Sequence, residues 1–251
     1  MKNKNITFKD IQNEFVEFID LCNRYTIYTC SKKIQEDKII ECKEFIEKIK
    51  YYKHCVTQNN IEEIVMNSYL NNLFHMQCFV NSIQSLLSVW VELKNEKPYP
   101  AWCSLVSAQE YIEIAIKIKE YEGAINWKNR LLNIEEVIFP ELVYLSGGYV
   151  ESIGKCSICS KNFAKCDHIE NHVYMGKLCQ RVDKEIKEVH HVAIVKNPRD
   201  RRCIIKSKTK NNYYIDCFTF EKTGEKILDQ DEKDALYCKS IILSTNELDL
   251  Y

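Results

Sequence analysis

The chain has 251 residues, enough for one large domain or two modest ones, and 45% of them are hydrophobic, so we expect a sizeable core rather than global disorder. The formal net charge of −1 excludes a whole-protein electrostatic field that would draw the chain to nucleic acid or to a membrane. Glycine (6 residues) and proline (4 residues) are scarce, which favours long helices over a turn-rich β fold.

The first 145 residues have the hydrophobic periodicity of a bundle of about five helices. The pattern is clearest over about 30 residues, roughly 45 Å of helix, in which apolar residues recur at steps of three and four. These residues are Ile61, Val65, Tyr69, Leu73, Met76, Val80, Ile83, Leu87 and Trp90. The other predicted helices are one opened by a capping box at Thr7–Asp10, one around Ile39–Tyr52, one from Pro100 to Gly123, and one at Trp127–Ile138, ended by Pro140.

The pattern changes at Ser146-Gly147-Gly148, the only glycine pair in the chain. We take this pair as the boundary between a helical domain (1–145) and a zinc-knuckle and small β domain (146–251), which makes the fold class α+β. The elements predicted after it are strands at Val192–Val195, Cys203–Lys206 and Tyr213–Phe220, a hairpin turn near Asn211-Asn212, and a closing helix at Asp231–Leu243.

Cysteine usage indicates a reducing cytoplasm. There are thirteen cysteines, and the first ten residues contain no apolar signal-peptide core. Those of the helical half are predicted to be small buried hydrophobic residues: Cys22, Cys30, Cys42, Cys55, Cys78 and Cys103. No apolar run reaches the ~18–20 residues of a membrane span, and no glycine-rich phosphate loop is present, so we expect neither a membrane association nor a nucleotide cofactor.

Four cysteines and a histidine lie within 24 residues and predict a metal site: Cys156, Cys159, Cys166, His168 and Cys179. Thiolate and imidazole at short spacing are the donors of tetrahedral Zn²⁺ sites, which take four ligands. Cys156 and Cys159 are the firmest pair, and His168 with Cys179 would complete a Cys₃His set. Cys166 is the alternative ligand that would displace Cys159 or His168.

A structural role of this zinc is expected over a catalytic one. The thiolate-rich donors suffice to close the coordination shell, whereas a catalytic zinc keeps a position open for water beside a carboxylate base. Asp167 and Glu170 are the nearby carboxylates, and Asp167 is expected to orient a ligand. A structural ion would supply folding free energy on the order of 10 kcal/mol. The alternative is a loop of unliganded thiols.

The Cys-x2-Cys step followed by Asp167-His168-Ile169 also resembles an HNH nuclease. In that family the Asp-His-Ile step lies on a strand, and the histidine activates water beside a divalent ion. Here the gap from Cys159 to Asp167 is shorter than the family has, and Cys179 stands alone where a second Cys-x2-Cys belongs. A metal-dependent nuclease acting at Asp167 and His168 is the enzymatic alternative.

A longer segment resembles a cysteine-histidine module of uncharacterised bacterial proteins and, more distantly, a segment of phage prohead proteases. It comprises the five metal-ligand candidates, Tyr174-Met-Gly176 and the strand Val192–Val195 followed by Pro198. In those proteases the strand carries the catalytic serine, and the corresponding position here is Ala193, which has no nucleophile. The resemblance covers about a fifth of the chain and implies a protease-like β module without protease activity.

A basic run from 196 to 210 is the candidate nucleic-acid surface. The run contains seven basic residues and one acidic residue, Asp200. The candidates for phosphate contact are Lys196, Arg199, Arg201, Arg202 and Lys206. The alternatives are a solvated hairpin and pairing in cis with the acid-rich segment 221–234. His75 and the tryptophans Trp90, Trp102 and Trp127 are predicted to be core residues.

The sequence therefore predicts a non-enzymatic zinc-binding accessory or adaptor protein that binds a protein partner through its helical half. The resemblance to phage proteins adds the expectation of a subunit of a bacterial phage-defence or mobile-element system. The two alternatives are a nucleic-acid-binding protein that uses the zinc module and the basic run, and the HNH-like nuclease.

Overall fold

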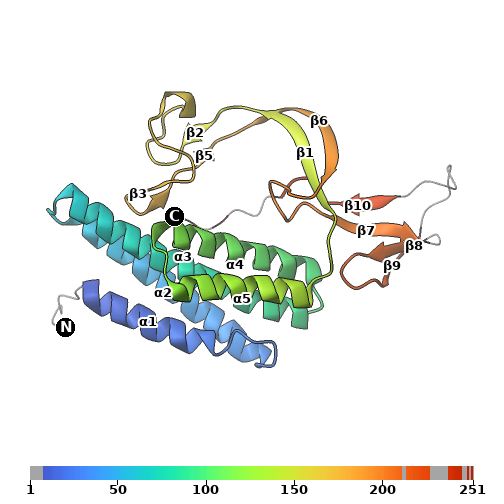
Figure 1. The fold of residues 1–251 in the computed structure, drawn as a ribbon, viewed down its shortest axis with the longest axis horizontal. Helices are drawn as coiled ribbons and strands as arrows, with labels where there is room; N and C mark the ends of the chain where they lie inside the picture. The colour runs from blue at the N-terminus through green and yellow to red at the C-terminus, as the bar shows by residue number, and fades with distance from the viewer. Residues whose placement is uncertain (1–7, 211–212, 227–236, 245–247, 249, 251) are drawn as a thin grey trace.

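A computed structural model of the chain describes residues 8–210, 213–226, 237–244, 248 and 250. Five helices come first and small antiparallel sheets follow, so the predicted α+β class is confirmed (Figure 1). The helices are α1 (Phe8–Asn23), α2 (Lys32–Gln58), α3 (Glu63–Lys94), α4 (Pro98–Ile118) and α5 (Glu122–Ile138). The strands are β1 (Tyr144–Glu151), β2 (Lys155–Cys156), β3 (Val173–Tyr174), β4 (Lys177–Leu178), β5 (Arg181–Val182), β6 (Ile186–Val195), β7 (Ile205–Lys210), β8 (Tyr213–Asp216), β9 (Lys222–Lys226) and β10 (Cys238–Ser240).

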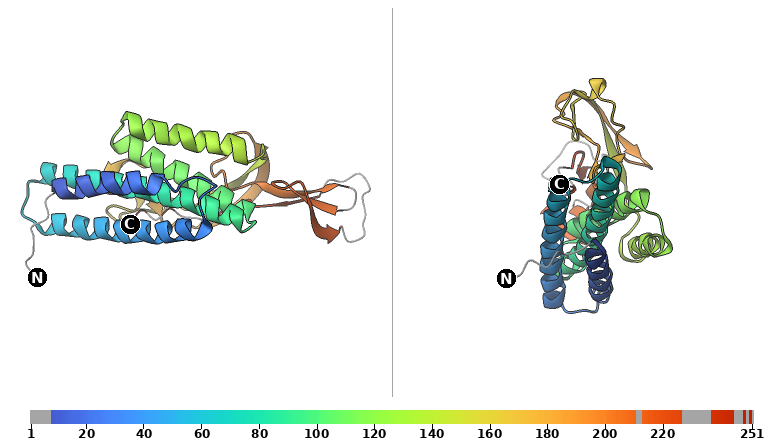
Figure 2. Two further views of the ribbon diagram at one scale, coloured as in Figure 1. Left: turned by 90° about the horizontal axis from the view of Figure 1, so that it is seen from below. Right: turned by 90° about the vertical axis from the view of Figure 1, so that its left-hand side faces the viewer.

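Helix α3 is the centre of the bundle. It packs along α4 on one side and along α2 on the other, while α1 also contacts it and α5 packs against α4 (Figure 2). Its middle part is buried on all sides, from Leu73 to Ile83, as expected of a helix that is surrounded by others. The long helix predicted from Ile61 to Trp90 is confirmed, and its carbonyl end is capped by Asn95.

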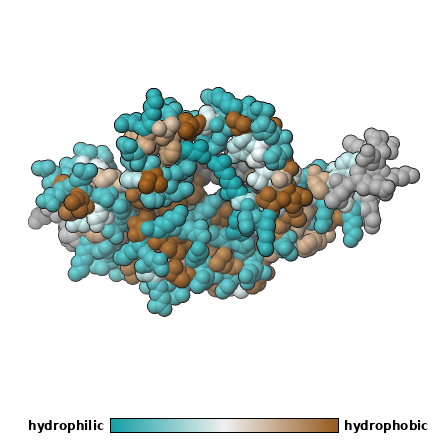
Figure 3. Space-filling model, turned by 45° about the horizontal axis from the view of Figure 1, so that its top comes forward, coloured by the Kyte–Doolittle hydropathy of each residue, from teal (hydrophilic) through white to brown (hydrophobic). Residues whose placement is uncertain are grey.

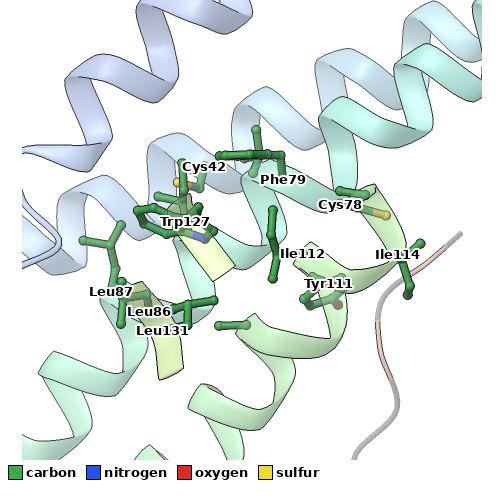
Figure 4. Packing of buried hydrophobic residues seen from close by; sticks show 14 of the residues in the cluster. Cys42, Cys78, Phe79, Leu86, Leu87, Tyr111, Ile112, Ile114, Trp127 and Leu131 are labelled. Atoms are coloured by element: carbon green, nitrogen blue, oxygen red, sulfur yellow. The ribbon is translucent and has the colours of Figure 1, made fainter. Parts of the chain in front are cut away.

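The core of the bundle combines close aliphatic packing with a few satisfied polar groups (Figure 4). The indole of Trp127 donates from Nε1 to Ser82 Oγ at 2.8 Å, and that hydroxyl donates to the carbonyl of Ala108 at 2.7 Å. This relay joins α3, α4 and α5. The tryptophans Trp90, Trp102 and Trp127 are buried, and so is His75, which confirms their prediction as core residues.

The ends of the helices follow local capping rules, with two differences from the sequence prediction. Ser31 caps α2 by accepting the N–H of Ile34 at 3.3 Å, and α4 begins at Pro98, two residues before the predicted Pro100. Helix α4 ends at Ile118, before Gly123, because the chain turns there into the separate helix α5. The predicted cap residue Thr7 lies outside the described residues.

Strands β1 and β6 form a long two-stranded ribbon that arches over α4 (Figure 1). The register shifts between Gly148 and Tyr149 and again between Val150 and Glu151, which leaves His190 and Lys187 as extra residues on β6. Such bulges bend and twist a ribbon, and they account for its curvature. The ribbon carries the chain from the bundle to the metal-ligand segment and back.

The glycine pair Gly147-Gly148, the predicted domain boundary, lies inside β1. A Cβ at Gly148 would collide with the ring of His191 across the ribbon, so glycine suits this close approach. The division into two domains at this position stays a prediction.

Strands β10, β7, β8 and β9 form a four-stranded antiparallel sheet in that order. The predicted hairpin is confirmed as β7 and β8, while its turn residues Asn211-Asn212 lie outside the described residues. The predicted closing helix was wrong where the structure describes it, because Cys238–Ser240 is a strand that pairs with β7. Among the described residues, no helix is long and apolar enough to cross a membrane.

Candidate metal centre

The first part of the site is a tight turn that follows β2. Strand β2 pairs with β5, which places Cys156 opposite Arg181. The chain then reverses, with Ser160 N–H donating to Cys156 O and Cys156 N–H donating to Lys161 O, each at 2.9 Å. This reversal holds Cys156 and Cys159 on one side of the turn.

The second part of the site is a short 3₁₀ turn at Phe163–Lys165. Asn162 opens it by accepting the N–H of Ala164 at 3.0 Å, and the N–H of Cys166 closes it onto the carbonyl of Phe163 at 3.3 Å. The chain leaves the turn extended, so Cys166 and His168, two residues apart, project toward the same side.

Four of the five predicted ligands converge. The donor atoms of Cys156, Cys159, Cys166 and His168 all lie within 4.8 Å of one another. Cys159 Sγ is 3.4 Å from Cys166 Sγ, and His168 Nδ1 is 3.2 Å from Cys166 Sγ and 3.7 Å from Cys156 Sγ. A tetrahedral zinc places two sulfurs about 3.8 Å apart, and a sulfur and a nitrogen about 3.6 Å apart. The cluster could therefore hold a metal ion.

Cys179 lies beside the cluster without being part of it. Its sulfur is 3.8 Å from Cys156 Sγ and fully buried, but Cys179 is not among the four residues whose donors are mutually close. The geometry thus favours Cys166 as the third thiol, where the spacing alone suggested Cys179 first. Sequence spacing could not decide between them, because both are within reach of the turn.

Backbone N–H groups that donate to the sulfur atoms stabilise negative charge in the cluster. Burial opposes ionisation of Cys156, but the N–H groups of Cys159 and Ile158 outweigh it and lower the pKa of this thiol to about 6. Burial raises the pKa of Cys166 to about 11, with further increases from the neighbouring sulfurs, although the N–H of His168 donates to its sulfur at 3.3 Å. The Cys156 thiol therefore ionises more readily than the Cys166 thiol, and a bound cation would favour the ionised form of both.

Tyr174 holds the imidazole of His168. The two rings meet edge to face with centroids 4.6 Å apart, and the N–H of Ile169 donates to Tyr174 Oη at 3.1 Å. The sequence had assigned an orienting role to Asp167, which is exposed, and had not assigned one to Tyr174. The sequence feature that could have pointed to this role of Tyr174 is its position in the Tyr174-Met-Gly176 motif.

The turn between β3 and β4 fixes the site to helix α3. The N–H of Met175 donates to Asn67 Oδ1 at 3.0 Å, and the N–H of Gly176 donates to Asn71 Oδ1 at 2.8 Å. Gly176 has φ of +71°, and a Cβ there would meet the carbonyl oxygen of Leu70 at 2.7 Å. Glycine is thus required both by the backbone conformation and by the close approach. No sequence pattern singled out the two asparagines.

Of the two nearby carboxylates, Glu170 is engaged by an arginine. Glu170 accepts from Arg181 Nε at 3.2 Å, and the same guanidinium binds Glu151 at 3.1 Å. Asp167 and His168 lie in a loop, not on the strand that an HNH-type site has. The Nδ1 atom of His168 faces sulfur atoms, an arrangement that favours a ligand over a base.

The basic run is not gathered into one exposed patch. The side chain of Arg202 is 3% exposed and binds Glu110 at 2.6 Å and Asp200 at 3.1 Å. Arg201 pairs with Glu135 and lies 4.9 Å from the ring centre of Trp102. These two arginines join the β half to α4 and α5.

The other three residues of the run are dispersed. Lys206 lies 4.8 Å from the ring centre of Tyr99, Arg199 donates to Tyr149 Oη at 3.1 Å, and Lys196 is exposed just beyond β6. Only Arg199 and Lys196 of the five candidates keep largely exposed side chains. A cleft of about 890 Å³ opens beneath the ribbon, lined by residues of both charges including Glu110, Arg181 and Arg199 (Figure 3).

Comparison with known proteins gives no match for this chain. No protein-family model, no curated protein and no solved structure matches it. The resemblance of the cysteine-histidine segment and of β6 to phage prohead proteases stays a prediction from the residues.

Proposed function

We propose that the chain is a non-enzymatic accessory or adaptor protein in which one structural Zn²⁺ stabilises the segment between β1 and β6. The observation that carries this proposal is the group of four donors from Cys156, Cys159, Cys166 and His168, mutually within 4.8 Å. Three thiols and an imidazole at these distances match the ligand set of closed zinc sites.

A structural role follows from the number and kind of the donors. Four protein ligands complete a tetrahedral shell and leave no position for a reacting water. Bound zinc would supply folding free energy, which this segment needs because few of its side chains are buried. The amides that donate to the sulfurs of Cys156 and Cys166 support the thiolate form that zinc requires.

The adaptor role rests on the exposed apolar side chains of the helices. Val16 on α1, Tyr51 on α2 and Ile64 at the start of α3 are 57%, 64% and 83% exposed. Side chains of this kind supply the buried contacts of protein interfaces. All thirteen cysteines are free, which supports a reducing compartment. A phage-defence or mobile-element setting rests on the resemblance alone.

Metal analysis of matched variants tests the zinc assignment. The purified chain should contain one zinc per molecule by mass spectrometry. Cys166→Ser should lose it, and Cys179→Ser, which changes a thiol beside the cluster, should keep it. A fully folded, metal-free protein would contradict the proposal, and zinc loss in Cys179→Ser alone would reassign the ligands.

The His168→Ala variant separates the structural role from the nuclease alternative. Loss of zinc together with loss of amide protection between β2 and β5 is the result expected for a structural ligand. Nuclease activity in the unmodified chain that disappears in His168→Ala, with zinc and fold retained, would overturn the non-enzymatic assignment.

A further inference from the structure

The four-stranded sheet of β10, β7, β8 and β9 extends beyond the end of the helix bundle (Figure 1 and the left-hand view of Figure 2). Its strands contain six lysines and only two acidic residues, Asp216 and Glu225. The sheet therefore carries an excess of positive charge. How this charge is divided between the two faces decides what the sheet can bind.

One face of the sheet gathers most of the lysines. Directly opposite residues of an antiparallel pair point to the same face. In the register of β7, β8 and β9, four lysines stand opposite or beside Tyr213 and Ile215 and so share a face with them. We call this surface the lysine face, and its lysines, all exposed, are Lys208, Lys210, Lys222 and Lys226.

Side-chain contacts confirm the two faces where the pairing of β8 with β9 is irregular. Lys222 Nζ lies 4.0 Å from the ring centre of Tyr213, so both side chains are on the lysine face. On the opposite face, Lys239 forms an ion pair with Glu225 and lies 4.8 Å from the ring centre of Tyr214. The contacts therefore agree with the register.

Both acidic residues of these strands lie on the opposite face. Asp216 stands opposite Ser207, the neighbour of Lys208 in β7. Glu225 directly precedes Lys226 in β9, and consecutive side chains of a strand alternate between faces. Among the described residues, none of the four lysines forms an ion pair with a carboxylate. The lysine face thus presents four positive charges without a counter-charge from its own sheet.

This arrangement fits a polymer of phosphates. Alternate residues of a strand are about 6.7 Å apart and neighbouring strands about 4.8 Å apart, so one extended polyanion can contact all four lysines. Lysine is a point charge on a flexible stem, which suits phosphate oxygens in any orientation and reads no base. A lipid surface would find little to bury, because Ile215, the aliphatic side chain of this face, is half-buried.

We propose that the lysine face binds the phosphate backbone of a nucleic acid without sequence preference. This activity goes beyond the adaptor role, and it is independent of the metal cluster, which lies between β1 and β6. The surface also differs from the five candidates of the basic run. It takes Lys208 and Lys210 from that run and adds two lysines of β9, whereas Arg201 and Arg202 are held by carboxylates of the helices.

The salt dependence of DNA binding by the full-length chain tests the proposal. Fluorescence anisotropy of a labelled duplex should show that log affinity falls with log salt concentration, with a slope of about −3.6 for four phosphate contacts. The joint change Lys208→Gln and Lys210→Gln should weaken binding about tenfold or more at low salt and reduce the slope to about −1.8.

A matched control removes the same charge elsewhere. Lys33→Gln on α2 together with Lys239→Gln on the opposite face of the sheet should leave both the affinity and the slope unchanged. Circular dichroism establishes that each variant is folded. No binding at low salt, or equal weakening by the control pair and by the pair on the lysine face, would overturn the proposal.

Further probes identify the occupant of the lysine face. Binding of a DNA duplex, of a single-stranded RNA or of both supports the proposal, and their relative affinities identify the preferred source of phosphates. Vesicles of equal parts phosphatidylcholine and phosphatidylserine should bind more weakly, and tighter binding to them would overturn the proposal.

The competing occupant within the chain is the segment 229–234, which has four acidic residues and lies outside the described residues. If DNA binds only after these four residues are changed to their amides, the chain's own segment covers the lysines and the proposal is wrong.

Discussion

The helical half, α1 to α5, and the segment between β1 and β6 are held together by different means. Helix α3 alone buries sixteen residues, most of them apolar. Between residues 152 and 185, all of which the structure describes, the buried hydrophobic residues are Cys156, Leu178 and Cys179. A segment with so little apolar burial gains little free energy from a core to offset its conformational entropy, and a metal ion held by the four donors would add to its stability.

The difference shows how one chain combines two forms of stabilisation without mixing them. The stability of the helical core is the sum of many small contributions from its buried apolar side chains. The segment between β1 and β6 instead has one cluster of four metal-ligand candidates, the contact of Tyr174 with His168, and two amide contacts from its β3–β4 turn to α3. A perturbation should therefore affect one region and spare the other.

Removal of the metal should separate the two regions most clearly. We expect chelation to unfold the segment between β2 and β5, because the ion would supply on the order of 10 kcal/mol there, while the helices persist. Hydrogen exchange is the measurement: the N–H of Cys156 and of Cys179, which are bonded to Lys161 O and His172 O, should lose protection. Equal loss of protection in α3 would contradict the separation.

A cavity in the helical core should have the opposite effect. Leu86 is fully buried on α3, and Leu86→Ala should lower the free energy of unfolding by about 2–5 kcal/mol. Urea denaturation monitored by circular dichroism measures this loss, and the zinc content should not change. Val137→Ala, at an exposed position, serves as the control and should stay within about 0.5 kcal/mol of the parent.

Acidification should destabilise the helical half through His75. Burial, and more weakly the Lys119 ammonium, lowers the pKa of this histidine to about 4. The unfolded chain binds a proton near pH 6.5 and the folded one near pH 4, so stability falls as the pH decreases between these values, by up to about 3 kcal/mol. Above pH 6.5 this contribution is constant.

Comparison of two histidine variants isolates that contribution. His75→Leu should flatten the dependence of the unfolding free energy on pH between about 6.5 and 4. His54→Gln, at an exposed position on α2, should keep the slope of the parent chain. An unchanged slope in His75→Leu would show that His75 has the same pKa in the folded and the unfolded chain.

The smallest expected effect lies at the junction of the two regions. Gly176→Ala combines strain at positive φ with a collision with Leu70 O, and should cost about 1–3 kcal/mol. Gly224 has φ of +84°, and a Cβ there would meet no atom of the described residues within 4 Å, so Gly224→Ala gives the strain alone. In thermal unfolding, Gly176→Ala should lower the melting temperature more than Gly224→Ala does. Equal decreases would contradict an added cost from the close approach of Gly176 to α3.

The helices were predictable because their side chains face a single core. The steps of three and four from Ile61 to Trp90 mark α3 to within a few residues, and the zinc-type spacing gave five candidates that include the four convergent donors, although it ranked Cys179 before Cys166. Both signals are local, because the hydrophobic periodicity and the spacing of the ligands can each be recognised within one short stretch of sequence.

The remaining features depend on contacts between distant segments. Gly148 lies in a strand that pairs with β6, where the ring of His191 takes the space of a Cβ, and Cys238–Ser240 is a strand that pairs with β7. Arg202 is buried because Glu110, some ninety residues earlier, meets it. No local pattern encodes these pairings, so the sequence alone suggested a closing helix and an exposed basic patch.

The contact of Trp102 with the basic run provides a built-in spectroscopic reporter. Its indole donates from Nε1 to the carbonyl of Arg201 at 2.8 Å, whereas Trp127 donates to Ser82 within the bundle. Detachment of the strands from the helices would expose the Trp102 indole to water and shift its fluorescence to longer wavelength. The light emitted by one side chain would thus report whether the two regions are docked, without any added label.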